Sequence, residues 1–286
     1  MEKNRTDLGS KIMRFKDAAL AKIQSIDITP EEILRAAIKV PGVRILREEF
    51  LKKELSRFYP EETVSKAIET NPAQAGIDRA RIDSIANSAI NYETNKVSAI
   101  SFMAGLPGGA AMAATIPVDV AQYFGFLIRA MQKLAYLYGF EEFEFDEEKI
   151  SDDTMNEMLL FLGTMFGVQS AAVGVKQLAQ TTAARVAKTL SQKALTKGTI
   201  YPIVKKVATQ LGVKMTKQVF AKGVSKVVPV LGGVVSGGLT YVTFRNCMYK
   251  LKGSFERLPI ADPDFYRREE SAEAVVAESN QEEFRG

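Results

Sequence analysis

Few residues in this chain have the types and spacing that catalysis requires. The 286-residue sequence contains no histidine, which removes the commonest general acid or base and the commonest metal ligand. The single cysteine, Cys247, has no histidine to activate it, so we expect a buried structural thiol rather than a nucleophile. We therefore predict no catalytic residue, no metal site and no cofactor-binding residue, and we expect that the protein is not an enzyme.

Two further groups could bind a small ligand, but each has a simpler interpretation. Six acids lie between Glu141 and Glu148, yet their spacing matches no calcium-binding loop. We expect a solvated loop, or a segment that faces the lysine-rich part of the chain. The glycine-rich stretch 105–109 could present backbone amides to a phosphate, but it lacks the lysine and Ser/Thr of a P-loop and no strand precedes it. The turn of a helical hairpin is the favoured interpretation.

The strongest signal in the sequence is the uneven distribution of charge. Residues 1–157 carry a net charge of −5, residues 158–255 carry +14, and residues 256–286 carry −5. The central stretch contains 14 Lys/Arg and no Asp or Glu, and 11 of these cations lie within residues 176–226. A basic block of this kind is typical of proteins that bind an anionic surface.

Anionic membrane lipid is the partner we favour for this basic block, because each Lys or Arg near an anionic leaflet contributes about 1 kcal/mol. A solvated basic face, neutralised by the acidic first half of the chain, is the alternative. Nucleic acid is not expected, because base-stacking aromatic residues are scarce between residues 176 and 226. The cations that we expect at the membrane surface are Arg185, Lys188, Lys205, Lys206, Lys214 and Lys217.

The elements that position these residues are predicted to be helices. Apolar residues recur at spacings of three and four, and Pro or Gly punctuates the segments, which indicates an all-α, multi-helix bundle. Thr29-Pro30-Glu31-Glu32 predicts a helix start, with Pro41-Gly42 after the end near Val40. A further basic amphipathic helix is expected at 202–212, with Lys205 and Lys206 turned away from its apolar face. Other helices are expected near 43–58, 60–70 and 76–103.

Three uncharged runs are expected to form glycine-rich apolar helices and hairpins. They cover Val97–Val118, which is interrupted by a turn with Pro107, and Met158–Val175 and Val227–Phe244. The last two have 18 residues each, near the lower limit of about 20 for a membrane span, and none of the three is predicted to be one. Glycines four residues apart let helices approach closely, and Pro117 is expected to start a long helix with Asp119 in its first turn. The packing and hairpin residues are Gly105, Gly108, Gly109, Pro117, Asp119, Gly163, Gly167, Gly233 and Gly237.

Two stretches together resemble the EcsC family. These are AGLPGGAAMAATIPVDVAQYFGFLIRAMQKLAYLYGF at 104–140 and VVPVLGGVVSGGLTYVTF at 227–244, and the resemblance spans roughly residues 90–250. It implies a bacterial helical protein whose family is named for a component encoded beside an ABC transporter, with a bacteriocin-like description in some members. A membrane protein complex is then a second candidate partner. The family supplies no catalytic residue to carry over.

The predicted organisation has three parts. Residues 1–85 form N-terminal amphipathic helices, residues 86–260 an EcsC-like helical domain, and residues 261–286 an acidic tail that is disordered or weakly helical. Residues 1–20 lack the apolar run of a secretory signal, so we expect a cytoplasmic protein, peripheral to the inner face of the cell membrane. Two alternatives stay open: a membrane-perturbing, pore-forming, bacteriocin-like protein, and a soluble protein with an unrecognised activity or nucleic-acid binding.

Overall fold

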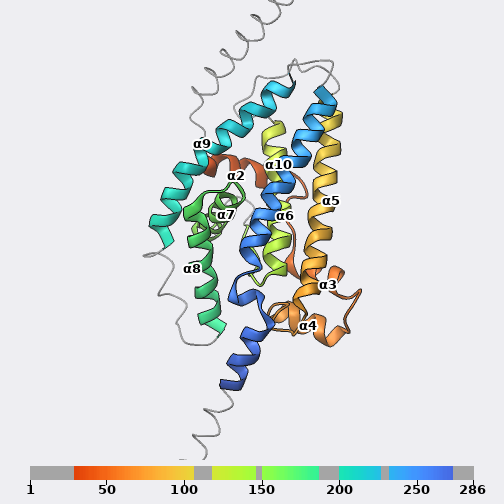
Figure 1. The fold of residues 1–286 in the computed structure, drawn as a ribbon, viewed down its shortest axis with the longest axis vertical. Helices are drawn as coiled ribbons and strands as arrows, with labels where there is room; N and C mark the ends of the chain where they lie inside the picture. The colour runs from red at the N-terminus through yellow and green to blue at the C-terminus, as the bar shows by residue number, and fades with distance from the viewer. Residues whose placement is uncertain (1–28, 106–117, 146–149, 187–199, 227–231, 273–286) are drawn as a thin grey trace, which may run out of the picture.

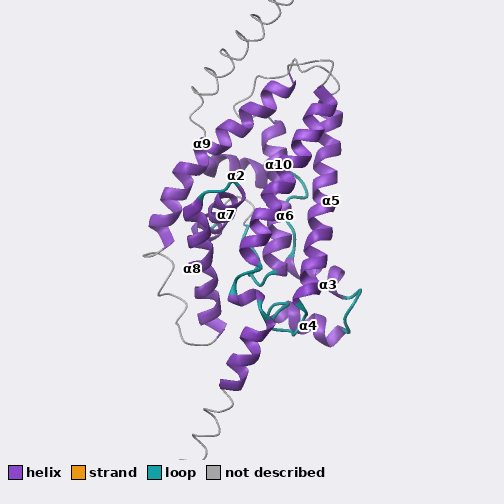
Figure 2. Cartoon of the chain, viewed as in Figure 1, coloured by secondary structure: helices purple, strands orange, loops and turns teal. Residues whose placement is uncertain are grey.

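The computed structural model describes residues 29–105, 118–145, 150–186, 200–226 and 232–272. Within these ranges the fold is all-α, a multi-helix bundle, and Phe145 and Ile150 form an isolated β-bridge (Figure 2). The helices are α2 (Pro30–Ile38), α3 (Arg47–Leu55), α4 (Glu61–Glu69), α5 (Arg79–Gly105), α6 (Val118–Leu137), α7 (Asp152–Met165), α8 (Gln169–Val186), α9 (Tyr201–Lys226), α10 (Gly232–Phe255) and the 3₁₀ turn η2 (Pro259–Ala261), followed by a helix over residues 263–272.

The start of α2 confirms the helix signal in the sequence. The Thr29 side chain accepts a hydrogen bond from the Glu32 backbone N–H at 3.2 Å, and the Glu32 carboxylate accepts one from the Thr29 N–H at 2.8 Å. This reciprocal pair satisfies two backbone donors at the helix start. The helix ends at Ile38, and Gly42 adopts a positive φ of 75° in the turn that follows.

Helices α5 and α10 pack against each other and run in opposite directions along the long axis of the molecule (Figure 1). At their lower end, Lys252 Nζ lies 3.3 Å from Asp83 Oδ1. Because the helices are antiparallel, this contact places the uncharged end of α5, residues 97–105, alongside the uncharged start of α10. The described parts of two of the three uncharged runs, residues 97–105 and 232–244, therefore lie side by side.

Helix α6 forms the centre of the bundle and joins the N-terminal helices to the rest. Most of its residues from Tyr123 onward are buried. The Gln132 side chain donates to the Val43 carbonyl at 2.8 Å and accepts from the Ile45 N–H at 3.0 Å. One hydrophobic core includes residues from both sides of position 85, which itself lies inside α5. The structure therefore has no break at the predicted boundary between residues 85 and 86.

The uncharged run Met158–Val175 is not one helix, so that part of the prediction is wrong. Helix α7 ends at Met165, and α8 begins at Gln169. Gly167 adopts a φ of 69° between them. The Val168 N–H donates to the Gly163 carbonyl at 2.8 Å, and the Gly167 N–H to the Thr164 carbonyl at 3.0 Å. This pair of bonds is a Schellman motif, in which glycine tolerates the left-handed conformation that ends a helix.

The segment from Ala261 is more ordered in its first part than the sequence indicated. Residues 263–272 are helical, and Tyr266 is buried. Its hydroxyl accepts a hydrogen bond from Asn71 Nδ2 at 2.8 Å and donates one to the Ile260 carbonyl at 3.4 Å. The rest of the predicted acidic tail, residues 273–286, lies outside the described residues.

The described helices also bear on the membrane-span question. None of them is both long and apolar enough to cross a bilayer. The turn of the predicted hairpin, including Gly108, Gly109 and Pro117, lies outside those residues.

Candidate functional site

The first half of α9 is an amphipathic helix, as the sequence predicted. Val204, Val207 and Leu211 are buried in the core, and Ile203 is partly buried against it. Residues at the intervening positions form an exposed stripe that repeats about every four residues, as one face of a helix does. This stripe, which we call the α9 stripe, consists of Tyr201, Pro202, Lys205, Lys206, Thr209, Gln210 and Val213.

The position of α9 depends on two glycines. A Cβ atom built on Gly163 of α7 would lie 2.5 Å from Val207 Cγ1 of α9 and 2.8 Å from Ala171 Cβ of α8. A Cβ atom on Gly174 of α8 would lie 2.5 Å from Leu160 Cδ2 of α7. Real Cβ atoms essentially never lie this close to other atoms, so a methyl group at either position would force its neighbours to shift. Sequence spacing identified Gly163 but not Gly174.

The α9 stripe combines cations with exposed apolar side chains. Lys205 and Lys206 are exposed, Tyr201 is 59% exposed and Val213 is 58% exposed. No ion pair joins either lysine to another described residue. A surface of exposed cations beside apolar side chains matches the headgroup region of an anionic membrane, where charge and apolar contact both contribute.

Exposed apolar side chains are concentrated in the acid-free stretch. Among the described residues, five of the eight large exposed hydrophobic residues lie within 158–255. Besides Tyr201 and Val213 they are Val173 on α8 and Tyr241 and Val242 on α10. Two of the other three lie near cations: Arg81 is 4.1 Å from the Phe58 ring centroid, and Lys133 is 5.3 Å from that of Tyr92. The basic part of the chain therefore also has an apolar surface.

The six cations predicted at the membrane surface are only partly brought together. Lys205 and Lys206 lie on the α9 stripe, and Lys214 and Lys217 belong to the same helix, although their side chains lie outside the described part. Arg185 lies in the last turn of α8, which ends at the lower side of the molecule, away from the end of α9 (Figure 1). Lys188 lies outside the described residues.

The predicted packing and hairpin residues have different roles where the structure describes them. Gly163 is a close-packing glycine, as predicted, but Gly167 ends α7 and does not pack a helix pair. Gly105 is the last residue of α5, and Asp119 lies in the first turn of α6, where an acid favours a helix start. Gly233 and Gly237 lie in the first part of α10, but their surroundings are outside the described part.

The acidic segment after α6 faces the N-terminal helices. Glu142 accepts a hydrogen bond from the Arg47 N–H at 3.0 Å, and its carboxylate lies 3.6 Å from Arg44. The described residues contain no group of acids, His or Cys arranged to hold a metal ion. Residues 146–148, the rest of this cluster, lie outside the description. For Glu142, the partners are therefore N-terminal arginines and not the lysine-rich block.

An interior ion-pair cluster between α5 and α6 was not predicted from the sequence. The Glu93 side chain on α5 is fully enclosed, with Oε1 3.4 Å from Arg129 Nε and 2.5 Å from Lys133 Nζ, both on α6. Arg129 also donates to the Gly42 carbonyl. The second Glu93 oxygen has no hydrogen-bond partner among the described residues. Two cations one turn apart within an otherwise apolar helix, Arg129 and Lys133, are the sequence signal that could have revealed this cluster.

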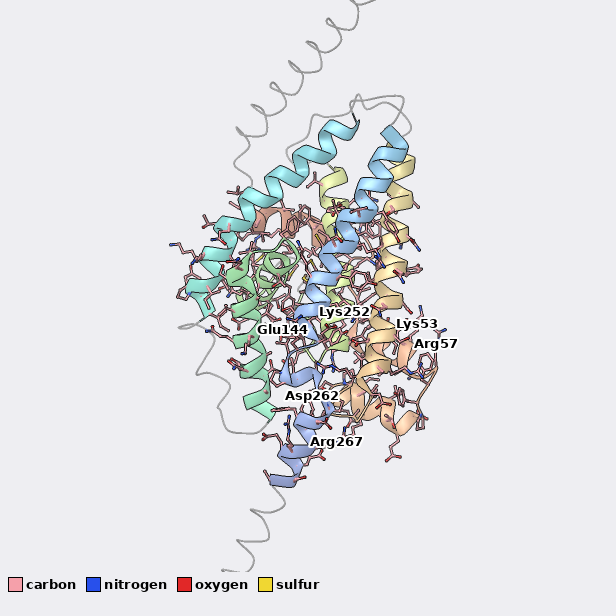
Figure 3. The ribbon with its side chains drawn as sticks, viewed as in Figure 1. Lys53, Arg57, Glu144, Lys252, Asp262 and Arg267 are labelled. Carbon is pink, nitrogen blue, oxygen red and sulfur yellow. The ribbon has the colours of Figure 1, made fainter. Side chains whose placement is uncertain are left out.

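A second interior cluster fixes the lower end of the α5–α10 pair. Lys252 Nζ lies 2.8 Å from Glu256 and 3.3 Å from Asp83, and the Tyr138 hydroxyl donates to Asp83 at 2.5 Å. Burial and the Asp83 carboxylate together raise the pKa of Tyr138. Figure 3 shows Lys252 in the lower half of the molecule, with Asp262 and Arg267 further down. These contacts join the lower ends of α5, α6 and α10.

A groove of about 460 Å³ between α3 and α4 is a third candidate site. Its lining includes Glu48, Glu61 and Glu69 but only one cation, Lys52. Such a groove repels anionic headgroups, so it does not extend the α9 stripe. Cys247, the single cysteine of the sequence, is buried, as the sequence predicted.

Comparison with known proteins adds no assignment to these surfaces. No model of a known protein family matches the chain, and neither a curated protein nor a solved structure matches it.

Proposed function

We propose that this protein is a non-enzymatic, membrane-associated helical protein of the EcsC type, which contacts anionic lipid at the inner face of the cell membrane. The α9 stripe carries this proposal, because it combines two exposed lysines with exposed Tyr201 and Val213 in a stretch that contains no acid. The family resemblance at 104–140 and 227–244 is consistent with it and remains part of the proposal.

The energetics of the α9 stripe suit reversible binding. Two lysines near an anionic leaflet contribute about 2 kcal/mol in total. Burying an exposed valine such as Val213 contributes at most about 1.5–3 kcal/mol more. A sum of this size is well below the free energy of inserting a spanning helix, so the protein should bind and leave the surface as salt and lipid composition change.

Co-sedimentation with vesicles tests the proposal. The protein should bind phosphatidylserine-containing vesicles but not neutral ones, and binding should weaken as salt rises from 0.1 M to 1 M, because the Debye length falls from about 10 Å to about 3 Å. Equal binding to neutral and anionic vesicles, or no binding to either, contradicts the proposal.

A matched pair of variants assigns the contact to α9. Lys205→Glu plus Lys206→Glu should weaken binding at least roughly thirty-fold, because removing two near-surface cations alone removes about 2 kcal/mol. The control is Lys52→Glu plus Lys53→Glu, which reverses two adjacent exposed lysines on α3. Both variants change the net charge equally. Equal weakening in the two variants would mean that net charge, and not the α9 stripe, determines binding.

A further inference from the structure

Helix α8 extends the surface of the α9 stripe on one side. A Cβ atom built on Gly174 of α8 would lie 3.2 Å from Ile203 Cγ2 of α9. About one turn away, Gly163 of α7 lies close to both Ala171 of α8 and Val207 of α9. The first two turns of α8 and of α9 therefore lie side by side, and the two helices run in opposite directions (Figure 1).

The outer side of α8 has the same character as the α9 stripe. Ala172, Val173 and Lys176 are exposed, and Val173 is 55% exposed. Spacings of three and four residues place them on one side of the helix. No ion pair joins Lys176 to another described residue. We call Ala172, Val173 and Lys176, together with the α9 stripe, the α8–α9 face.

Charge and apolar contact on the α8–α9 face both favour an anionic bilayer. Its exposed lysines are Lys176, Lys205 and Lys206, and neither α8 nor α9 contains an acid. The exposed Val173 is one turn from Lys176, and the exposed Tyr201 is one turn from Lys205. A bilayer with anionic headgroups accepts both kinds of side chain, the cations at the phosphates and the apolar groups below them.

Helix α2 limits the α8–α9 face on the other side of α9. A Cβ atom built on Gly212 of α9 would lie 3.7 Å from Cδ of Pro30, the first residue of α2. The first turn of α2 carries Glu31 and Glu32, and Glu32 is exposed. Because these acids repel anionic headgroups, the cationic surface of α9 continues toward α8 and ends toward α2.

Helix α7 has its exposed acids beyond the contact of α8 with α9. Leu160 of α7 packs against Gly174 of α8. The exposed Asp152 and Asp153 precede Leu160 by seven residues or more, which is roughly 10 Å along a helix. Glu157 lies nearer, but it is partly buried. The exposed acids of α7 are therefore level with the later turns of α8 and not with the α8–α9 face.

We infer that the protein lies on an anionic bilayer with its α8–α9 face, so that Val173 and Lys176 form a second lipid contact beside the α9 stripe. This inference rests on the proposed function and adds a second helix and the orientation of the molecule. A bilayer surface is flat, and packed helices have axes only about 8–10 Å apart, so the outer sides of both helices can touch it together. Figure 1 shows α8 and α9 on one side of the bundle and α5 on the other, so α5 faces away from the membrane.

Single-tryptophan reporters test this orientation without background, because the chain contains no tryptophan. Val173→Trp reports on α8, Tyr201→Trp on the α9 stripe, and Tyr92→Trp on α5. Tyr92 is the matched control, because it has the same 59% exposure as Tyr201 and also lies near a lysine, Lys133. With phosphatidylserine vesicles, the emission of Val173→Trp and Tyr201→Trp should shift to shorter wavelength and be quenched by brominated lipid. The emission of Tyr92→Trp should stay unchanged.

The outcomes separate this inference from the proposed function. A response of Tyr201→Trp without one of Val173→Trp keeps the α9 contact and overturns the contact of α8. A response of Tyr92→Trp overturns the orientation. No vesicle binding by any of the three variants overturns the inference and the proposed function together, and leaves an acidic protein as the occupant of the α8–α9 face.

A pair of charge variants gives an independent readout. Lys176→Glu should weaken vesicle binding at least roughly fivefold, because one near-surface cation contributes about 1 kcal/mol. The control is Lys250→Glu, which reverses an exposed lysine of the same acid-free stretch on α10, a helix that packs against α5. Its binding should stay within about twofold of the unchanged protein. Circular dichroism establishes that both variants are folded. Equal weakening in the two variants, or unchanged binding of folded Lys176→Glu, overturns the inference.

Discussion

The two ends of the bundle place charge in opposite ways. At the lower end, oppositely charged side chains meet on the surface, as in Arg267 with Asp264 at 2.6 Å and Arg57 with Glu54 at 3.7 Å. At the upper end, residues 97–105 and 232–244 carry no charge at all. Exposed ion pairs contribute only about 0–1 kcal/mol each, so the lower charges mainly keep that surface in water. Residues 97–105 and 232–244 have no charged side chain that could do the same.

Between the two ends, the interior uses charge in a third way. Glu93 joins α5 to α6 through Arg129 and Lys133, just below the uncharged part of α5. Because the carboxylate is fully enclosed, its partners cannot be replaced by water. We therefore predict that the free energy of unfolding depends far more on the enclosed Glu93 carboxylate than on an exposed acid.

The largest expected effect separates interior charge from surface charge. Glu93→Gln should lower the free energy of unfolding by about 3 kcal/mol, because it leaves two partly buried cations without a counter-charge. Asp264→Asn removes an exposed acid and should change it by less than about 0.5 kcal/mol. Urea denaturation followed by circular dichroism measures both. Similar effects from the two variants would contradict the distinction.

The next prediction compares a glycine packed against α9, Gly163, with a glycine on the open surface of α10, Gly238. Gly163→Ala should destabilise the fold by about 2 kcal/mol, because its methyl group would overlap Val207 and Ala171. Gly238→Ala should instead stabilise α10 by up to about 1 kcal/mol, because no atom lies within 4 Å of an added Cβ and alanine favours helix. Thermal unfolding gives the sign of each change. A stabilising Gly163→Ala would show that α7 and α9 do not approach closely.

The smallest effect concerns the acidic tail. Removing residues 273–286 deletes a net charge of −3 but keeps Tyr266 and its contact with Asn71. Figure 1 shows residues 263–272 at the lower end of the bundle, opposite residues 97–105 and 232–244. Because salt screens charges over such separations, vesicle binding should strengthen by less than about threefold. Co-sedimentation of the truncated protein measures this. A tenfold increase would establish that the tail screens the basic block.

Much of the fold could be predicted from local signals. Thr29-Pro30-Glu31-Glu32 predicts the start of α2 because capping residues act on their own helix. The exposed positions of Lys205 and Lys206 follow from the helical spacing of the apolar residues around them. These features depend on neighbours within one or two turns, which the sequence contains in full.

Features that depend on distant segments were not predictable in the same way. A glycine four residues after another has the same spacing inside a helix as at its end, so Gly167 was interpreted as a packing residue. The close contact of Gly174 depends on Leu160 of a different helix. For the candidate site, the lysines of α9 were predicted, but their neighbours Tyr201 and Val213 were not, because exposure of an apolar residue depends on which helices pack around it.

The hydrogen bond between Asn71 and Tyr266 has a consequence for how the chain is made. The two residues are 195 positions apart, and Tyr266 is near the end of the chain. At about 5–20 residues per second, a ribosome needs roughly ten to forty seconds after adding Asn71 before it adds Tyr266. The contact of Asn71 with Tyr266 can therefore form only after all the helices between them have left the ribosome.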